Sequence, residues 1–292
     1  MRCVQVDLIC ASPYLTPWRN ATLWGRLTWG VANGAAKGWT IEKWLQAYEE
    51  NRPPLVVSDG FPKEAVPVPA LYQAELPHKG KKPKTLPWAA WLELCKNGAW
   101  PDVKEEEVPE LNRTHVMIGR ETGTVGEAAL RTEKGWHPKD GILIVAMLSD
   151  DLSEDDFRSL VNYLCFEGWG YGLSYGYGAI DLNGIYPLDR PDAGHCVAAL
   201  GHIHPTDDLP ADGYWRWTGV PIRRRDNPAL GNQGQLAFAP MLATGSSFPL
   251  GHDRASVGEL RKPDTDSNSK YVHYGLAPTW PLMMSEVSDG QS

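Results

Sequence analysis

Paired cysteines, nucleotide-loop motifs and long apolar runs are missing from this sequence, and each absence excludes a class of protein. The five cysteines (Cys3, Cys10, Cys95, Cys165, Cys196) form no Cys-x-x-Cys pair, so neither a zinc site nor a disulfide framework is indicated. No apolar run reaches membrane-spanning length, and the first residues have the pattern of a short strand and not of a signal peptide. We therefore expect a soluble, cytoplasmic protein that needs no membrane, metal or cofactor.

The sequence also has no excess of basic residues. It contains 28 Lys and Arg and 36 Asp and Glu, which gives a formal net charge of −8. This balance argues against a free-standing protein that holds nucleic acid by bulk electrostatics. Two short basic clusters, 78–84 and 222–225, could hold RNA locally, although such runs are commonly solvated loops. The 13 Trp are compatible with base stacking but do not demonstrate it.

What the sequence does contain is a glycine-rich segment, 166–178, between an expected helix and an expected strand. Its glycines permit positive φ angles and can bring backbone N–H groups against an anion. A dinucleotide fingerprint would follow a strand and open a helix, and the segment also lacks a Walker lysine, so both nucleotide motifs are excluded. Phosphate or nucleic acid remains the first ligand to consider, and a tight structural corner is the alternative.

Hydrophobic periodicity and capping residues predict the main elements of the chain. We expect strands at 2–9, 55–58, 141–148 and 179–182, helices at 21–32, 40–49 and 153–164, and a turn at 59–62. The proline-rich region 63–110 reads as a long insertion whose one helix is 88–95, and the glycines and β-branched residues of 111–131 predict a hairpin.

This order predicts an α+β fold, a ferredoxin-like (RRM-type) sandwich in which helices cover one face of an antiparallel sheet. We assign residues 1–190 to this first domain, with the insertion (63–110), the hairpin (111–131) and a glycine-rich loop (168–178). Strand-like segments at 214–218, 235–239 and 271–275 predict a second, β-rich domain over 191–292.

Several separate segments, in order along the chain, resemble the RAMP-superfamily subunit of type III-A CRISPR (Csm) complexes that binds the crRNA 5′ handle. They are Thr22–Trp29 in the first helix, the turn Val57–Pro62, the mid-chain segment Asn112–Gly123, the glycine-rich loop Gly170–Gly178 and the C-terminal strand Val272–Ala277. The glycine loop departs from similar proteins because it carries Leu173, Ser174 and three tyrosines where they often have charged residues. Backbone N–H groups, the Ser174 hydroxyl and tyrosine stacking remain available for RNA.

The resemblance implies a RAMP-like second domain and a non-catalytic scaffold role. Such a protein orders the repeat-derived crRNA handle and joins the large polymerase-cyclase subunit to the RAMP backbone subunit. Target RNA is then only an indirect partner. It also implies a thumb-like hairpin pressed between crRNA nucleotides. The RNA-binding residues expected on this basis are Arg19, Thr22, Arg26, Asn112, Arg113, His115, Met117, Ile118, Arg120, Gly170, Gly172, Ser174, Tyr175, Gly176 and Gly178.

Two other functions stay open from the sequence. A metal-independent endoribonuclease that processes crRNA would use His as acid and base, and His195, His202 and His204 lie near one another in sequence. In a strand, His202 and His204 would share one face, although no histidine matches a catalytic position of the processing enzymes. A solitary RRM-like RNA-binding protein would be expected to have a basic face and aromatic RNP motifs, and the sequence indicates neither.

Overall fold

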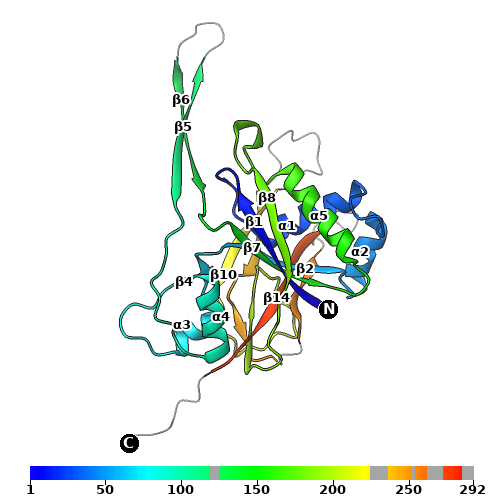
Figure 1. Ribbon diagram of the computed structural model, residues 1–292, viewed down its shortest axis with the longest axis vertical. Helices are drawn as coiled ribbons and strands as arrows, with labels where there is room; N and C mark the ends of the chain where they lie inside the picture. Colours follow the sequence, from blue (N-terminus) through cyan, green and yellow to red (C-terminus); the bar gives the residue numbers. More distant parts are fainter. Residues whose placement is uncertain (119–124, 224–235, 251–253, 262–271, 285–292) are drawn as a thin grey trace, which may run out of the picture.

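The first sheet of the computed structural model has the strand order β2-β7-β1-β8, with every neighbouring pair antiparallel. The structure describes residues 1–118, 125–223, 236–250, 254–261 and 272–284. The four strands are β1 (Arg2–Cys10), β2 (Leu55–Pro62), β7 (Ile142–Leu148) and β8 (Ile180–Pro187). They run through the middle of the molecule in Figure 1.

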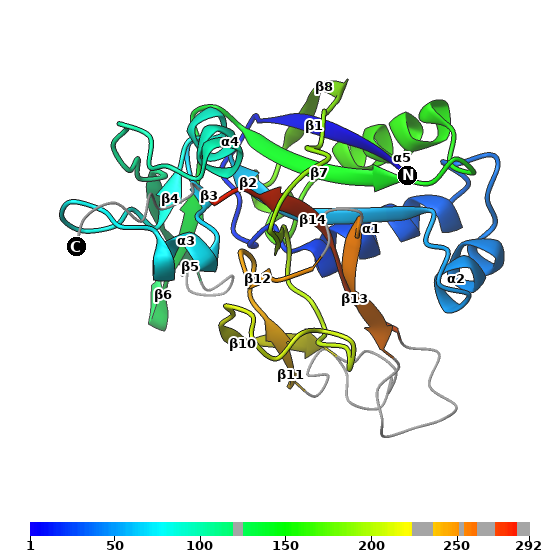
Figure 2. The same ribbon diagram turned by 90° about the horizontal axis from the view of Figure 1, so that it is seen from below.

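Helices α1 (Asn20–Ala32) and α5 (Glu154–Glu167) pack against each other on one face of this sheet, and α2 (Ile41–Glu49) lies beside α1 (Figure 2). The hydroxyls of Thr40 and Ser153 accept hydrogen bonds from the N–H groups of Lys43 and Asp156, which caps α2 and α5 at their predicted first turns. All three helices therefore agree with the periodicity and capping signals in the sequence.

Strand β7 is an unbroken apolar run because both of its faces are buried. Ile142, Ile144 and Ala146 join the core beneath α1 and α5, whereas Leu143 and Val145 join a second core on the opposite face. The sheet is therefore covered on both sides.

The region 63–110 is folded against that second face, and the expectation of a single helix within it is wrong. It holds β3 (Val66–Pro67), α3 (Ala70–Glu75), β4 (Thr85–Leu86) and α4 (Trp88–Asn97). The missed helix, α3, is only six residues long and its N-cap is a proline, so it carries neither a periodic stripe nor a capping side chain. Leu71, Tyr72 and Trp91 nevertheless anchor the region in the second core.

The predicted hairpin is present as β5 (Glu110–Ile118) and β6 (Val125–Trp136). It projects well away from the rest of the molecule in Figure 1. Its base is tied to the body because Tyr14 and Trp136 exchange backbone hydrogen bonds of 3.0 and 2.9 Å.

The described residues after 191 contain strands and no helix. The strands are β9 (Cys196–Ala199), β10 (Trp217–Arg223), β11 (Leu236–Leu242), β12 (Ser247–Phe248), β13 (Ser256–Arg261) and β14 (His273–Leu282). Four of them form a sheet in the order β12-β9-β14-β13, and β10 pairs with β11. Strand β10 begins three residues later than the sequence pattern indicated.

Residues 59–62 were predicted as a turn but continue strand β2, whose pairing with β7 shifts register between Val57 and Gly60. Ser58 and Asp59 form this bulge and Gly60 pairs with Ile144, so the Asp-Gly pair that is locally typical of a turn lies within the strand instead. Across the described ranges, no helix is both long enough and apolar enough to cross a membrane.

Candidate RNA-binding surface

The glycine loop, residues 168–178, folds onto the segment 12–18 that leads into α1. The N–H of Tyr171 donates to the Thr16 hydroxyl (2.9 Å), and the indole N–H of Trp169 donates to the Thr16 carbonyl (2.7 Å). The Trp169 ring also stacks on Trp18, with ring centroids 3.9 Å apart and planes 4° from parallel. The loop is therefore a fixed feature of the surface beside the start of α1.

Glycine is required where this loop meets other backbone. Gly178 has φ 69°, and a Cβ built there would lie 2.0 Å from the Trp169 carbonyl oxygen. The N–H groups of Tyr175, Gly176 and Gly178 donate to carbonyls of the chain, and among the described residues we find no acceptor for those of Gly172, Leu173 and Ser174. These three N–H groups are consecutive, which leaves one small backbone patch for an anion.

Helix α1 carries three of the predicted RNA contacts next to this loop. Thr22 and Trp29 are exposed and Arg26 is half-buried on one face of the helix, and Arg19, also half-buried, is its N-cap residue. The Arg26 guanidinium is 4.0 Å from the carboxylate of Glu167, the last residue of α5 before the loop. The structure thus brings Arg19, Thr22 and Arg26 together with the glycine loop, although nearly 150 residues separate them in sequence.

The hairpin contributes Arg113, whose guanidinium carbon lies 6.0 Å from the centroid of the Tyr177 ring in the glycine loop. Asn112 and Arg113 are exposed on β5, so the base of the hairpin belongs to the same surface. His115, Met117 and Ile118 are placed on β5 by backbone alone, their side chains being outside the described residues, and Arg120 lies wholly outside them.

Two exposed aromatic side chains on this surface, Phe166 and Trp29, were not among the expected RNA contacts, whereas stacking by the loop tyrosines was expected. Phe166 at the end of α5 is 85% exposed, Trp29 on α1 is 57% exposed, and Tyr171 in the loop is 49% exposed. The predicted residue Tyr175 is 61% exposed. Phe166 and Trp29 lie on the helix faces opposite the buried residues of α5 and α1, so helical periodicity already indicates that they are exposed.

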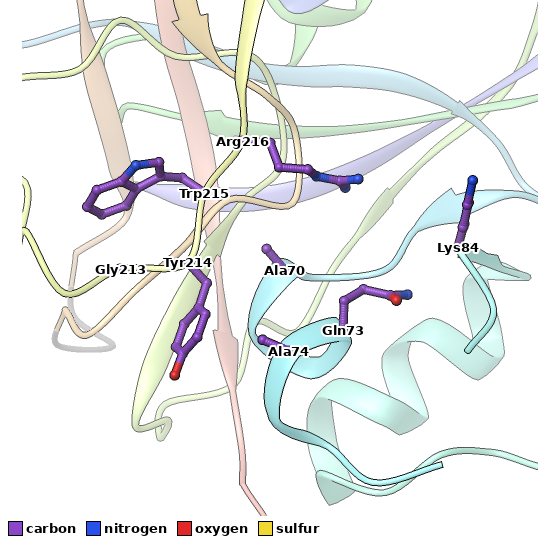
Figure 3. A pocket seen from close by; sticks show the side chains of 8 residues that line it. All are labelled: Ala70, Gln73, Ala74, Lys84, Gly213, Tyr214, Trp215 and Arg216. Atoms are coloured by element: carbon purple, nitrogen blue, oxygen red, sulfur yellow. The ribbon is translucent and has the colours of Figure 1, made fainter. Parts of the chain in front are cut away.

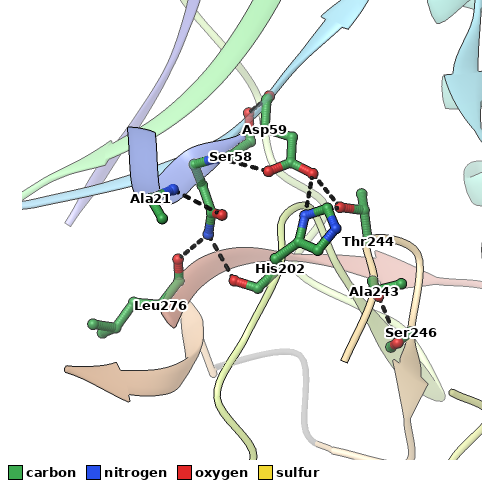
Figure 4. Close-up of polar contacts among 9 residues, drawn as sticks. Ala21, Ser58, Asp59, His202, Ala243, Thr244, Ser246 and Leu276 are labelled. Carbon is green, nitrogen blue, oxygen red and sulfur yellow. Dashed lines mark hydrogen bonds and ion pairs between the residues drawn. The ribbon is translucent and has the colours of Figure 1, made fainter. Parts of the chain in front are cut away.

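Asp59, from the segment 57–62, is a buried junction between four parts of the chain (Figure 4). Its Oδ1 accepts from the Asn20 N–H (2.7 Å) at the first turn of α1, and its Oδ2 lies 2.8 Å from Nδ1 of His202 and accepts from the Thr244 hydroxyl. A carboxylate at a helix N-terminus also meets the positive end of the helix dipole. The side-chain amide of Asn20 donates in turn to the carbonyls of His202 (2.8 Å) and Leu276 (2.7 Å).

The histidines considered as an acid–base pair are separated by the fold. Only residue 203 of the segment 202–204 makes a β-bridge, so His202 and His204 are not on one strand face. His202 contacts Asp59, whereas His204 contacts His273, with Nε2 and Nδ1 2.6 Å apart, and His195 is exposed. Among the described residues, no group of three or more His, Cys, Asp or Glu could hold a metal ion.

Several solved structures share the fold of this chain over nearly its whole length. No protein-family model and no curated protein matches its sequence. A chain in a Csm1–Csm4 cassette bound to pppApA superposes with a TM-score of 0.61 at 15% identity, over 98% of this chain and 100% of that one. A Csm1–Csm4 cassette bound to cA3 gives 0.59 at 16%, over the same shares. The Csm3–Csm4 subcomplex of a type III-A CRISPR–Cas interference complex gives 0.56 at 13%, over 97% and 99%. The resemblance inferred from sequence is thereby confirmed at the level of the fold.

Proposed function

We propose that this chain is the non-catalytic, crRNA 5′-handle-binding scaffold subunit of a type III CRISPR interference complex. In this role it joins the large polymerase-cyclase subunit to the RAMP backbone subunits, as a cytoplasmic ribonucleoprotein component. The observation that carries the proposal is the shared fold over 97–98% of this chain with chains from both kinds of assembly. Csm4, a RAMP subunit, is the one name common to the Csm1–Csm4 and Csm3–Csm4 structures.

The strand order supports the finer fold assignment that the proposal needs. The units β1-α1-β2 and β7-α5-β8 make one antiparallel sheet of order β2-β7-β1-β8, which is the arrangement of a ferredoxin-like, RRM-type domain with an insertion between its second and third strands. We assign a RAMP-like second domain to the sheet of β9, β12, β13 and β14.

The candidate surface supports RNA as the ligand. It combines guanidinium groups (Arg19, Arg26, Arg113), backbone N–H groups of the glycine loop, and exposed aromatic rings. Single-stranded RNA is commonly held by stacking and phosphate contacts of these kinds. Because the net charge is −8, these local groups fit a fixed position in an assembly better than solitary RNA capture.

Co-purification tests the proposal directly. The tagged chain is expressed with the large subunit, the backbone RAMP subunit and a repeat-spacer array, and the RNA in the purified complex is sequenced. We expect a defined complex whose RNAs share one repeat-derived 5′ end. An isolated chain that instead cleaves repeat RNA, with the activity abolished by His→Ala changes, would favour the processing nuclease.

The hairpin assignment has its own test in the same system. Arg113→Ala combined with Arg120→Ala should reduce crRNA incorporation while circular dichroism stays unchanged. The matched control is Lys37→Ala with Arg158→Ala, which removes two exposed cations from the α1–α2 loop and from α5. Full crRNA incorporation in the hairpin variant would overturn the hairpin assignment.

A further inference from the structure

A second cationic site lies on the other side of the molecule from the glycine loop. A surface pocket of about 600 Å³ opens between helix α3 and the segment that leads into β10 (Figure 3). It is lined by Ala70, Gln73, Ala74, Lys84, Gly213, Tyr214, Trp215 and Arg216. Figure 3 shows Arg216 and Gln73 directed to the side of the pocket where Lys84 stands. A pocket of this size can hold a nucleotide-sized group.

The lining of the pocket carries two cations and no carboxylate. Neither the Lys84 ammonium nor the Arg216 guanidinium pairs with an acidic side chain among the described residues. Other cations of this region are paired, such as Arg254 with Asp208 and Arg261 with Glu259 (2.5 Å each). Within the part of the chain that the structure describes, both cations are therefore available to an anionic ligand in the pocket.

The nearest carboxylates, Glu75 and Glu105, keep their negative charge but are held by neutral donors and not by the two cations. The Glu75 carboxylate accepts from the Tyr214 hydroxyl at 2.5 Å. Glu105 accepts from the N–H groups of Lys84 and Thr85 at 3.0 and 3.3 Å, so it contacts the backbone at Lys84 and not its ammonium. The Tyr214–Glu75 contact instead joins the two walls of the pocket.

The basic cluster 78–84 leads directly to this pocket. Lys82 donates to the Gln73 carbonyl (2.7 Å) at the end of α3, and this contact folds the loop back so that Lys84 reaches the pocket. Lys79 and Lys81 stay exposed along the same loop. A row of cations that continues beyond the pocket suits a polyanion better than a small isolated anion, because successive phosphates can meet successive cations.

We propose that the pocket formed by α3, Lys84 and Arg216 binds the phosphate backbone of a single RNA strand, at a site separate from the glycine-loop surface. The Arg216 guanidinium offers the planar fork that matches phosphate oxygens, and the Lys84 ammonium adds a point charge. Gln73 supplies an amide beside them. The exposed lysines of the 78–84 loop carry the strand away from the pocket.

Binding of a fluorescein-labelled 12-nucleotide single-stranded RNA to the full-length chain tests this site. Fluorescence anisotropy is measured across a salt series for the wild type, for Lys84→Gln with Arg216→Gln, and for the matched control Lys37→Gln with Arg158→Gln. We expect the pocket variant to weaken binding about 5-fold or more at low salt and to reduce the log K against log salt slope by about 1 to 2. The control should stay within about 2-fold of wild type.

Three outcomes would overturn the proposal. They are an unchanged affinity and slope in the pocket variant, an equal loss in the control variant, and displacement of the RNA by polyglutamate as effectively as by unlabelled RNA. Urea unfolding of the variants verifies that they are folded. Incorporation of the crRNA handle into the co-expressed complex is measured in a separate experiment. A negative result for this pocket therefore does not contradict RNA binding at the glycine-loop surface.

Discussion

At the scale of single residues, Asp59 connects segments that are far apart in the sequence, and no sequence motif around it indicates this role. Its buried carboxylate takes hydrogen bonds from α1, from the Thr244 hydroxyl and from the His202 ring. We predict that Asp59→Asn lowers the free energy of unfolding by about 2 to 4 kcal/mol, because one oxygen becomes an N–H₂ that faces donors in a buried site. Urea denaturation measures this change.

Asp208→Asn is the matched control, because Asp208 pairs with Arg254 but keeps 57% of its side chain exposed. Ion pairs of that kind contribute at most about 1 kcal/mol, so the control should change stability little. An Asp59 variant as stable as the Asp208 variant would show that this network is not a structural junction.

A second residue-scale prediction concerns the contact between His204 and His273. Burial, together with repulsion from His273 and Arg261, lowers the pKa of His204 to about 3, and burial lowers the pKa of His273 to about 4. Both rings are neutral in the folded state, whereas in the unfolded chain they take up protons below a pKa of about 6.5. Stability is therefore fully present above pH 6.5 and falls as the pH drops towards 4.

His273→Gln removes one of these proton-linked groups. We expect its unfolding free energy to depend less steeply on pH between 6.5 and 4.5 than that of the wild type, even if its stability at pH 7.5 is lower. His195→Gln, at an exposed position, is the matched control and should keep the wild-type slope. Equal slopes for all three proteins in urea titrations would contradict this account.

At the scale of elements, the glycines of the glycine loop have two possible roles: they allow the loop to fold, or they allow a ligand to approach the backbone closely. Substitutions at two of them distinguish these roles. Both Gly176 and Gly178 have positive φ, but nothing lies within 4 Å of a Cβ at Gly176, whereas one at Gly178 meets the Trp169 carbonyl. Gly176→Ala should cost about 1 to 2 kcal/mol from backbone strain alone. Gly178→Ala should cost more, because the loop has to move away from Trp169.

Thermal unfolding and crRNA incorporation together separate the two roles. A folded Gly176→Ala variant that loses RNA would indicate close backbone approach by the ligand at that glycine. If both variants are equally stable, the contact between Gly178 and Trp169 does not hold the loop.

Elements with local signals were predictable from the sequence, and those made by distant contacts were not. The caps Thr40 and Ser153 and the apolar run of β7 act within a few residues, so their elements were found. The bulge at Asp59 depends on His202 and Thr244, more than 140 residues away, so a local Asp-Gly signal was mistaken for a turn. Helix α3 is stabilised by the second core and not by its own sequence.

The same distinction applies to the candidate site. The glycine spacing pointed to the loop, and the family resemblance pointed to Arg26. Phe166 lies on the face of α5 opposite Leu160 and Leu164, so the helical pattern itself indicates its exposure. Sequence alone could not place this end of α5 beside α1, because that depends on how the two helices pack.

At the scale of the whole molecule, the predicted regions 1–190 and 191–292 are joined through a shared interior. Tyr274 of β14 stacks on Trp24 of α1, with ring centroids 5.0 Å apart, and its hydroxyl accepts a hydrogen bond from the Val57 N–H (3.1 Å). Trp280 of the same strand lies in the second core with Leu143 and Val145. The last described strand therefore completes both cores of the first region.

We accordingly predict that residues 1–190 expressed alone do not form a stable fold, because removal of β14 uncovers Trp24 and the second core at a cost of several kcal/mol. Size-exclusion chromatography and calorimetry should find aggregated material without a cooperative transition, whereas the full chain should unfold in one main transition. Co-expression of 191–292 as a separate chain should restore soluble material, because it returns the strand that fills both cores. A monomeric 1–190 fragment with its own sharp transition would mean that the two regions fold independently and that β14 only docks onto a finished core.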